Sequence, residues 1–211
     1  MAKVRQEEGG SRLRMFVALD LSGAVREGIA AWGDGALADP ALRRVDAEAL
    51  HITLAFLGSR PAADAEGVAA AMKASVAASP SIELLDPVSR PRRGRARIFA
   101  LPVISAGAEG MQLELGERLA SEGLCEPEKR PFWPHVTVAR VRLEGGGSKR
   151  PIWVDRFPQS LAAELRKPSF CRRVTLYRSE LQPSGARYVP LAQVELPGEG
   201  GSEVMRWQTG K

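Results

Sequence analysis

Two stretches of the chain repeat each other in the same order, and this internal repeat constrains the fold more than any other feature. Arg14–Leu19 (RMFVAL) resembles Arg97–Leu101 (RIFAL), and His51–Ala55 (HITLA) resembles His135–Ala139 (HVTVA). The offset is 83 residues for the first pair and 84 for the second. Similar segments at a nearly fixed offset are typical of duplicated structural units. The chain is therefore expected to contain two related lobes.

Apolar patterning predicts the same succession of elements in each half. Loop signals occur at Gly58–Ala62, Pro87–Gly94 and Glu144–Pro151. Strands are predicted at Leu13–Asp20, His51–Leu57, Ala96–Ile104, His135–Leu143, Phe170–Leu181 and Arg187–Leu196. Helices are predicted at Ala24–Trp32, Ala62–Ala78, Ala108–Glu122 and Gln159–Arg166. The expected fold class is α+β: two duplicated lobes related by a pseudo-two-fold axis, each an antiparallel-rich sheet with helices outside, and an active cleft between them.

The domain organisation follows from the repeat and the composition. With 44% apolar and 26% charged residues, the 211-residue chain is typical of globular proteins and long enough to bury a core without disulfides. Residues 12–196 are predicted to form one bilobal domain, and the polar, Gly-rich segments 1–11 and 197–211 are predicted to be tails. Because the symmetry is internal, a monomer is expected.

Charge and cysteine content limit the location and the partners. No apolar run reaches the ~20 residues of a membrane helix, and residues 1–14 lack the apolar core of a signal peptide. Cys125 and Cys171 lie far apart, so reduced thiols in the cytoplasm are expected, although a single disulfide stays open. We expect no membrane partner. The net charge of +5 favours an anionic partner in a general way.

The two histidines stand in matching surroundings. His51 and His135 are the only histidines, and each is followed by Thr at the second position, Thr53 and Thr137, among only four threonines. Chance would give this roughly 3 times in 10,000. Residues i and i+2 of a strand share a face, so each histidine shares a face with its threonine. If the lobes are related by a two-fold axis, both faces meet at one cleft.

Such a site suits phosphoryl transfer. One neutral and one charged imidazole form a base and an acid near neutral pH. Hydroxyls of Thr53 and Thr137 donate hydrogen bonds to anionic oxygens, and Arg130 and Arg140, which flank the second motif, neutralise charge. A base, an acid and donors to the equatorial oxygens are what an in-line displacement at phosphorus requires.

Other chemistries fit the sequence less well. A zinc site lacks a third ligand at recognisable spacing, since there is no CxxC and no His–x₃–His. There is no Gly–x–Ser–x–Gly motif for a serine nucleophile, no phosphate-binding Walker loop and no dinucleotide-binding glycine pattern. No metal and no cofactor are expected.

Aromatic and basic residues near the motifs are open to two interpretations. Phe132 and Trp133, just before His135, either stack on a base or pack at the core or the lobe interface, and packing is favoured. Phe16 and Phe99 occupy equivalent places in the repeat and are predicted to be core residues. The arginine-rich segment 90–97 is either a solvated loop or a contact for a phosphate backbone.

These motifs resemble those of the 2H phosphoesterase superfamily, and within it the RNA 2′,3′-cyclic phosphodiesterase family, also called 2′-5′ RNA ligase family proteins. The resemblance covers roughly residues 12–196 and rests on RMFVALDL, LHITLAFLG, RPFWPHVTVAR, LYRSEL and GARY. Trp133 departs from the pattern, because a basic or polar residue is common there.

The resemblance implies a bilobal, metal-free enzyme that hydrolyses a terminal RNA 2′,3′-cyclic phosphate to a 2′-phosphomonoester. It implies that His51 is the general acid and His135 the general base, that Thr53 and Thr137 hold the non-bridging oxygens, and that Arg140, and less clearly Arg130, binds phosphate or nucleotide. The alternatives are 2′-5′ ligation of RNA, a small cyclic nucleotide as substrate, or a non-catalytic RNA-binding module.

Overall fold

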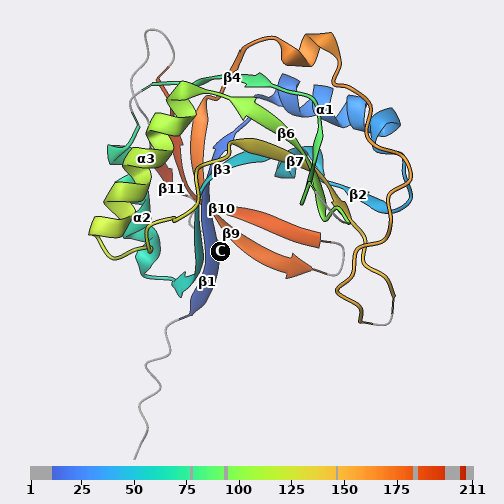
Figure 1. The fold of residues 1–211 in the computed structure, drawn as a ribbon. Coiled ribbons are helices and arrows are strands. Elements are labelled where there is room, and N and C mark those ends of the chain that lie inside the picture. Colours follow the sequence, from blue (N-terminus) through green and yellow to red (C-terminus); the bar gives the residue numbers. More distant parts are fainter. Residues whose placement is uncertain are drawn as a thin grey trace, which may run out of the picture.

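The computed structural model has the mixed architecture that the apolar pattern predicts (Figure 1). It describes residues 11–76, 78–92, 95–145, 147–182, 185–197 and 205–207. The strands are β1 (Arg12–Asp20), β2 (Leu42–Arg44), β3 (His51–Pro61), β4 (Ser81–Leu84), β5 (Val88–Arg90), β6 (Ile98–Ile104), β7 (His135–Val141), β8 (Ser169–Phe170), β9 (Arg173–Gln182), β10 (Gly185–Glu195) and β11 (Met205–Trp207). The helices are α1 (Gly23–Ala36), α2 (Asp64–Ala74) and α3 (Ala106–Ser121), with 3₁₀ turns η1 (Ala47–Ala49) and η2 (Ala163–Arg166).

The strands form one curled antiparallel sheet in the order β11-β10-β9-β1-β3-β7-β6-β4-β8, with β2 paired to β7 and β5 to β6. The strands β9, β1 and β3 stand on one side of the centre, and β7, β6 and β4 stand on the other. Helices α2 and α3 lie side by side on one flank of the sheet and α1 on the other (Figure 1). The predicted α+β fold of two duplicated halves is confirmed, and the halves contribute to one continuous sheet.

The pseudo-two-fold axis passes between β3 and β7. The one residue pair of this ladder joins Ile52 to Val136, which are equivalent residues of the repeat. A pairing of equivalent residues in antiparallel strands is what a two-fold axis between the strands produces. The two repeated sequence segments therefore form equivalent structural elements in the two halves.

The first helix of each half begins in the same way. The side chain of Ser22 accepts a hydrogen bond from the backbone N–H of Val25, and that of Ser105 accepts one from Ala108. Serine at this position satisfies a backbone donor that the helix itself leaves free. The two serines are 83 residues apart, the offset of the first repeated segment.

The predicted helix Gln159–Arg166 is wrong, because only its last four residues form the turn η2. Tertiary contacts occupy the backbone groups that a helix would need. The carbonyl of Ser160 accepts a hydrogen bond from Trp32 Nε1, and the N–H of Leu161 donates to Asp86.

Three predicted irregular segments contain strand residues. The loop expected at Gly58–Ala62 is mostly strand, because Gly58 takes a φ of +69° at a bulge that lets β3 continue to Pro61. Strand β5 lies within the loop expected at Pro87–Gly94, and β11 lies within the segment 197–211. The other parts of both predicted tails lie largely outside the described residues.

The core lies between the sheet and the helices. It holds Val17 and Leu19 of β1, together with Phe99, which is buried as predicted. Cys125 and Cys171 are free thiols, and burial raises the pKa of Cys171 to about 12. In the part of the chain that the structure describes, no helix has the length and apolar character needed to cross a membrane.

Candidate active site

The two His–x–Thr motifs open β3 and β7, the two central strands of the sheet. His51, Thr53, His135 and Thr137 are all half-buried, whereas the residues between them, Ile52 and Val136, are fully buried. This alternation sets histidine and threonine of each motif on one face of the sheet. Since Ile52 pairs with Val136, the structure brings the two motifs together across the pseudo-two-fold axis.

Both imidazole rings are held by the same backbone contact. Nδ1 of His51 lies 2.8 Å from the carbonyl oxygen of Ala49, and Nδ1 of His135 lies 2.7 Å from that of Trp133. A carbonyl only accepts, so Nδ1–H must donate in each ring, which leaves Nε2 to exchange a proton in the neutral form. Nε2 of His51 lies 3.1 Å from the Thr53 hydroxyl, which donates to it in that form.

A β-bulge follows each motif and brings a third residue to the same face. In β3, Ala18 pairs with Thr53 and Val17 with Ala55, so Leu54 is the extra residue. Because a bulge adds one residue to the strand, each residue beyond it points to the opposite face from the one that strict alternation would give. Consequently Phe56 lies on the face of His51, and the residue is 72% exposed.

The second half repeats this bulge. Ala100 pairs with Thr137 and Phe99 with Ala139, so Val138 is the extra residue. The next residue on the face of His135 is Arg140, which is exposed. The predicted phosphate-binding residue therefore reaches the site because of the bulge.

The surroundings of His51 are aromatic. Its ring lies 5.0 Å from Phe16 and 5.3 Å from Tyr188, centroid to centroid, and Tyr177 stacks on Phe16 at 5.3 Å. Phe16 is buried, as predicted for a core residue, but it packs against the proposed acid. Both tyrosines come from the two C-terminal strands, so β9 and β10 complete this side of the site.

Asp20 supplies a negative charge beside His51. The two residues are paired across β1 and β3, and Asp20 is 5% exposed. Its carboxylate accepts hydrogen bonds from Arg173 Nε at 2.7 Å, from the Thr175 hydroxyl at 2.7 Å and from the Tyr177 hydroxyl at 2.9 Å. These three donors satisfy the buried carboxylate and fix its position.

The surroundings of His135 are different. The Trp133 ring stacks on its imidazole with centroids 4.0 Å apart and planes inclined by 14°. The guanidinium carbon of Arg90 lies 4.0 Å from the centre of the same indole ring. Trp133 thus packs within the site, and Arg90, from the arginine-rich segment 90–97, joins it there; residues 93 and 94 of that segment lie outside the described residues.

Burial and charge act together on the two imidazoles. Burial lowers the pKa of His51, the bond to Ala49 and the charge of Asp20 act to raise it, and the charges of His135 and Arg140 lower it further. Burial also lowers the pKa of His135; the bond to the Trp133 carbonyl acts to raise it, and Arg90 lowers it. Each ring is therefore biased toward its neutral form in the free protein.

Arg130 is the predicted residue that the structure does not join to this cluster. Its side chain is 83% exposed and forms an ion pair with Glu128, whose carboxylate also accepts from the Arg130 backbone N–H. Within the described residues, no group of three or more His, Cys, Asp or Glu side chains is arranged to hold a metal ion.

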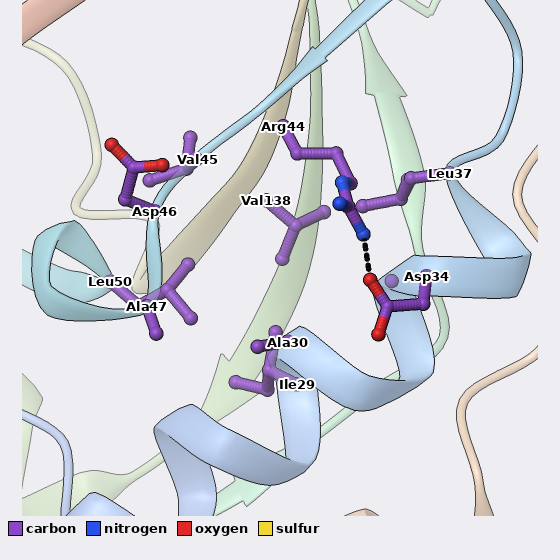
Figure 2. A pocket seen from close by; sticks show the side chains of 11 residues that line it. Ile29, Ala30, Asp34, Leu37, Arg44, Val45, Asp46, Ala47, Leu50 and Val138 are labelled. Carbon is purple, nitrogen blue, oxygen red and sulfur yellow. Dashed lines mark hydrogen bonds and ion pairs between the residues drawn. The ribbon is translucent and has the colours of Figure 1, made fainter.

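A small pocket of about 160 Å³ lies elsewhere, between α1 and the segment that carries β2 and η1 (Figure 2). Val138 lines it, together with the ion pair of Asp34 and Arg44 (Figure 2). Because Val138 faces away from the motif threonine, this pocket lies behind the site and contains neither histidine.

Sequence reasoning missed Asp20, Arg90 and Phe56 as members of the site. Asp20 ends the first repeated strand, and Phe56 follows its motif at the distance at which Arg140 follows the other. These regularities in the sequence point to both residues, but they can be interpreted only once the strand pairing and the positions of the bulges are known.

No family model matches the chain. An *Escherichia coli* (strain K12) protein named RNA 2′,3′-cyclic phosphodiesterase is 31% identical over 184 residues, which are 84% of this chain and 93% of that protein. A *Thermus thermophilus* protein of the same name is 32% identical over 161 residues, 73% of this chain and 75% of that one.

Solved structures agree with these relatives. *E. coli* LigT complexed with 3′-AMP superposes with a TM-score of 0.69 at 25% identity, covering 89% of this chain and 100% of that one. TT0787 of *Thermus thermophilus* gives a TM-score of 0.68 at 26% identity, covering 89% and 100%. Sequence identity over almost the full length of the *E. coli* relative shows that this chain belongs to the RNA 2′,3′-cyclic phosphodiesterase family.

Proposed function

We propose that this protein hydrolyses RNA 2′,3′-cyclic phosphate ends to 2′-phosphomonoesters, with His51 as general acid and His135 as general base. The observation that carries the proposal is the matched orientation of the two imidazoles. Each ring is fixed through Nδ1 by a backbone carbonyl, on neighbouring strands that meet at the pseudo-two-fold axis. Two oriented imidazoles on one face of the sheet can supply an acid and a base to a single phosphorus atom.

Nε2 of neutral His135 takes a proton from water as the water oxygen bonds to phosphorus. The bond from phosphorus to O3′ breaks, and Nε2–H of charged His51 gives its proton to O3′. The product carries a 2′-phosphate and a free 3′-hydroxyl, and proton exchange with solvent restores both histidines.

Thr53, Thr137 and Arg140 provide the groups that face the phosphate in this proposal. Hydroxyl donors hold the non-bridging oxygens, and a guanidinium neutralises the charge that develops on them. Arg130 is proposed as a more distant contact, because its guanidinium is already engaged by Glu128. The reaction as proposed uses no metal and no cofactor.

The RNA end as substrate is supported by the names of the two relatives and by the 3′-AMP bound to *E. coli* LigT. A net charge of +5 suits an anionic substrate. We also propose that residues 12–196 form the catalytic unit, that the protein acts as a monomer since both histidines come from one chain, and that it acts in the cytoplasm.

A product assay tests the proposal. The protein is incubated with EDTA and an RNA oligonucleotide ending in a 2′,3′-cyclic phosphate, and the monoester is identified by chromatography against 2′- and 3′-phosphate standards. A 2′-phosphate, absent with His51→Ala and His135→Ala, is the expected product.

The other outcomes are distinct. Turnover of 2′,3′-cyclic AMP but not of the oligonucleotide would indicate a small cyclic nucleotide as substrate. Joining of the cyclic end to the 5′-hydroxyl of a second RNA would indicate ligation, in which that hydroxyl replaces water. Binding without any product would indicate a non-catalytic RNA-binding module.

A further inference from the structure

The two halves of the site match in backbone but differ in the charges next to the histidines. We propose that Arg90 is a positioning residue that disfavours a proton on His135, that Trp133 is a positioning residue that orients the His135 ring, and that Asp20 is a positioning residue that favours a proton on His51. The inference rests on the proposed function, since it concerns which histidine gives and which takes the proton. It assigns the two roles from the surroundings of the rings.

Comparison of the two halves of the repeat shows which contact of His135 has no counterpart at His51. Trp133 and Ala49 are equivalent, since each stands two residues before its histidine and offers the carbonyl that holds Nδ1. Only the tryptophan has a ring that stacks on the imidazole, at 4.0 Å. The indole orients the His135 ring, and its face also contacts the Arg90 guanidinium.

Arg90 adds an uncompensated charge. Its guanidinium lies against the same indole, and its Nη1 is buried without a hydrogen-bond partner among the residues that the structure describes. Within those residues no carboxylate forms an ion pair with it. A cation without a paired anion disfavours protonation of the neighbouring imidazole and lowers its pKa.

Asp20 has the opposite sign and a fixed place. It is paired across the strands with His51, whereas the residue paired with His135 in the second half is the apolar Pro102. Three hydrogen bonds, from Arg173, Thr175 and Tyr177, hold its buried carboxylate in place. A buried anion beside an imidazole favours the protonated ring.

Other groups face the two rings. Arg140 and His135 act on His51 from β7 with positive charge, and Tyr188 and Phe16 contact it as uncharged rings. These groups serve the phosphate or pack the ring, and they leave Asp20 as the negative charge that acts on His51. The two rings thus differ in one respect: Asp20 offsets part of the lowering of the His51 pKa, whereas Arg90 adds to the lowering of the His135 pKa.

An NMR titration measures the pKa of each histidine in the absence of substrate. Because the chain has only two histidines, two imidazole signals are followed by NMR from pH 4 to 9 and assigned with His51→Gln and His135→Gln. Arg90→Gln is expected to raise the pKa of His135 by about one pH unit and to leave His51 nearly unchanged. Asp20→Asn is expected to lower the pKa of His51. Arg92→Gln, an exposed arginine two residues away, is the matched control and should move neither.

The pH dependence of the kinetics then tests whether the charge of Arg90 acts on the general base. In Arg90→Gln the low-pH limb of kcat/KM moves upward, because a base of higher pKa becomes neutral only at higher pH. In Arg90→Lys the low-pH limb of kcat/KM is expected to stay at its wild-type pH, because the positive charge is kept. Trp133→Phe is expected to keep more activity than Trp133→Ala, because a ring still orients His135.

Unchanged titration of His135 in Arg90→Gln, or movement of the high-pH limb in its place, overturns the inference. If Asp20→Asn does not fold, the Arg90 variants still decide it. If the wild-type protein turns over no cyclic phosphate while the NMR shifts occur as expected, the proposed function fails and the difference between the two rings stands.

Discussion

Phe56 and Arg140 hold equivalent places in the two halves: each is the third residue of its strand to face the site, delivered there by a β-bulge. One half thus offers an aromatic ring and the other a cation. A nucleotide end has both a base and a phosphate, so the two positions match its two kinds of surface.

Replacing Arg140 with alanine should weaken phosphate binding. A charge-assisted hydrogen bond is worth enough that kcat/KM should fall roughly 10- to 100-fold. Steady-state kinetics on a cyclic-phosphate oligonucleotide measure this. Arg130→Ala is the control and should cost clearly less, because its guanidinium is paired with Glu128 in solvent. Equal losses in both variants would show that Arg140 has no special place at the phosphate.

Replacing Phe56 with alanine should raise KM and leave kcat nearly unchanged. The exposed ring is expected to stack on a base, and stacking of one base contributes about 1–3 kcal/mol, or roughly 5- to 150-fold. Phe56→Tyr should retain binding, since it keeps the ring. A Phe56→Ala protein that loses kcat at unchanged KM would contradict a role confined to binding.

Removing either imidazole should slow the chemical step. His51→Ala and His135→Ala should each lower kcat by roughly 10²- to 10⁴-fold, the usual contribution of a general acid or base. Single-turnover rates measure this without interference from product release. Near-normal turnover in one variant would remove that histidine from the mechanism, whereas equal losses are expected from a pair that acts on one phosphorus.

The pH dependence should be a bell centred below pH 6.5 for kcat/KM. Burial lowers the pKa of both His51 and His135 below the usual value of 6.5, and kcat/KM reports the free enzyme. Activity should fall at low pH as the base becomes charged and at high pH as the acid loses its proton. The kcat profile should lie at higher pH, because a bound phosphate anion favours both charged imidazoles. A sigmoid with a single limb would contradict a two-histidine mechanism.

Chelation should leave activity unchanged. Among the described residues no cluster of His, Cys, Asp and Glu is arranged as a metal site, and the proposed proton transfers need none. Assays after dialysis against EDTA, with and without added Zn²⁺ or Mg²⁺, measure this. Loss of turnover that zinc restores would require a metal in the reaction.

The repeat in the sequence was sufficient to predict the duplicated α+β fold and the meeting of the two motifs. Strong strand patterns with a motif at the strand start, as in His51–Leu57 and His135–Leu143, predicted β3 and β7. Failures occurred where tertiary bonds overrode local preference, as at Gln159–Arg166. At Gly58 a loop was predicted where the strand continues, because a glycine can mark a bulge inside a strand as well as a loop.

The electrostatic part of the site was harder to predict. Asp20 and Arg90 reach the histidines through strand pairing and ring stacking, and neither contact has a local sequence signature. Trp133 was visible as a departure from the family pattern, but its orientation depends on the fold. What can be predicted from the sequence is therefore the symmetric part of the site.

The pairing of Ile52 with Val136 places two equivalent histidines at a pseudo-two-fold axis, yet the reaction needs one of them to give a proton and the other to take one. A true dimer of identical halves would give its two imidazoles identical surroundings, and neither could be the better donor. Both halves here belong to one polypeptide, so each can vary without the other. Substitutions at single positions, such as tryptophan in one half where the other has alanine, give a nearly symmetric frame a direction for the proton.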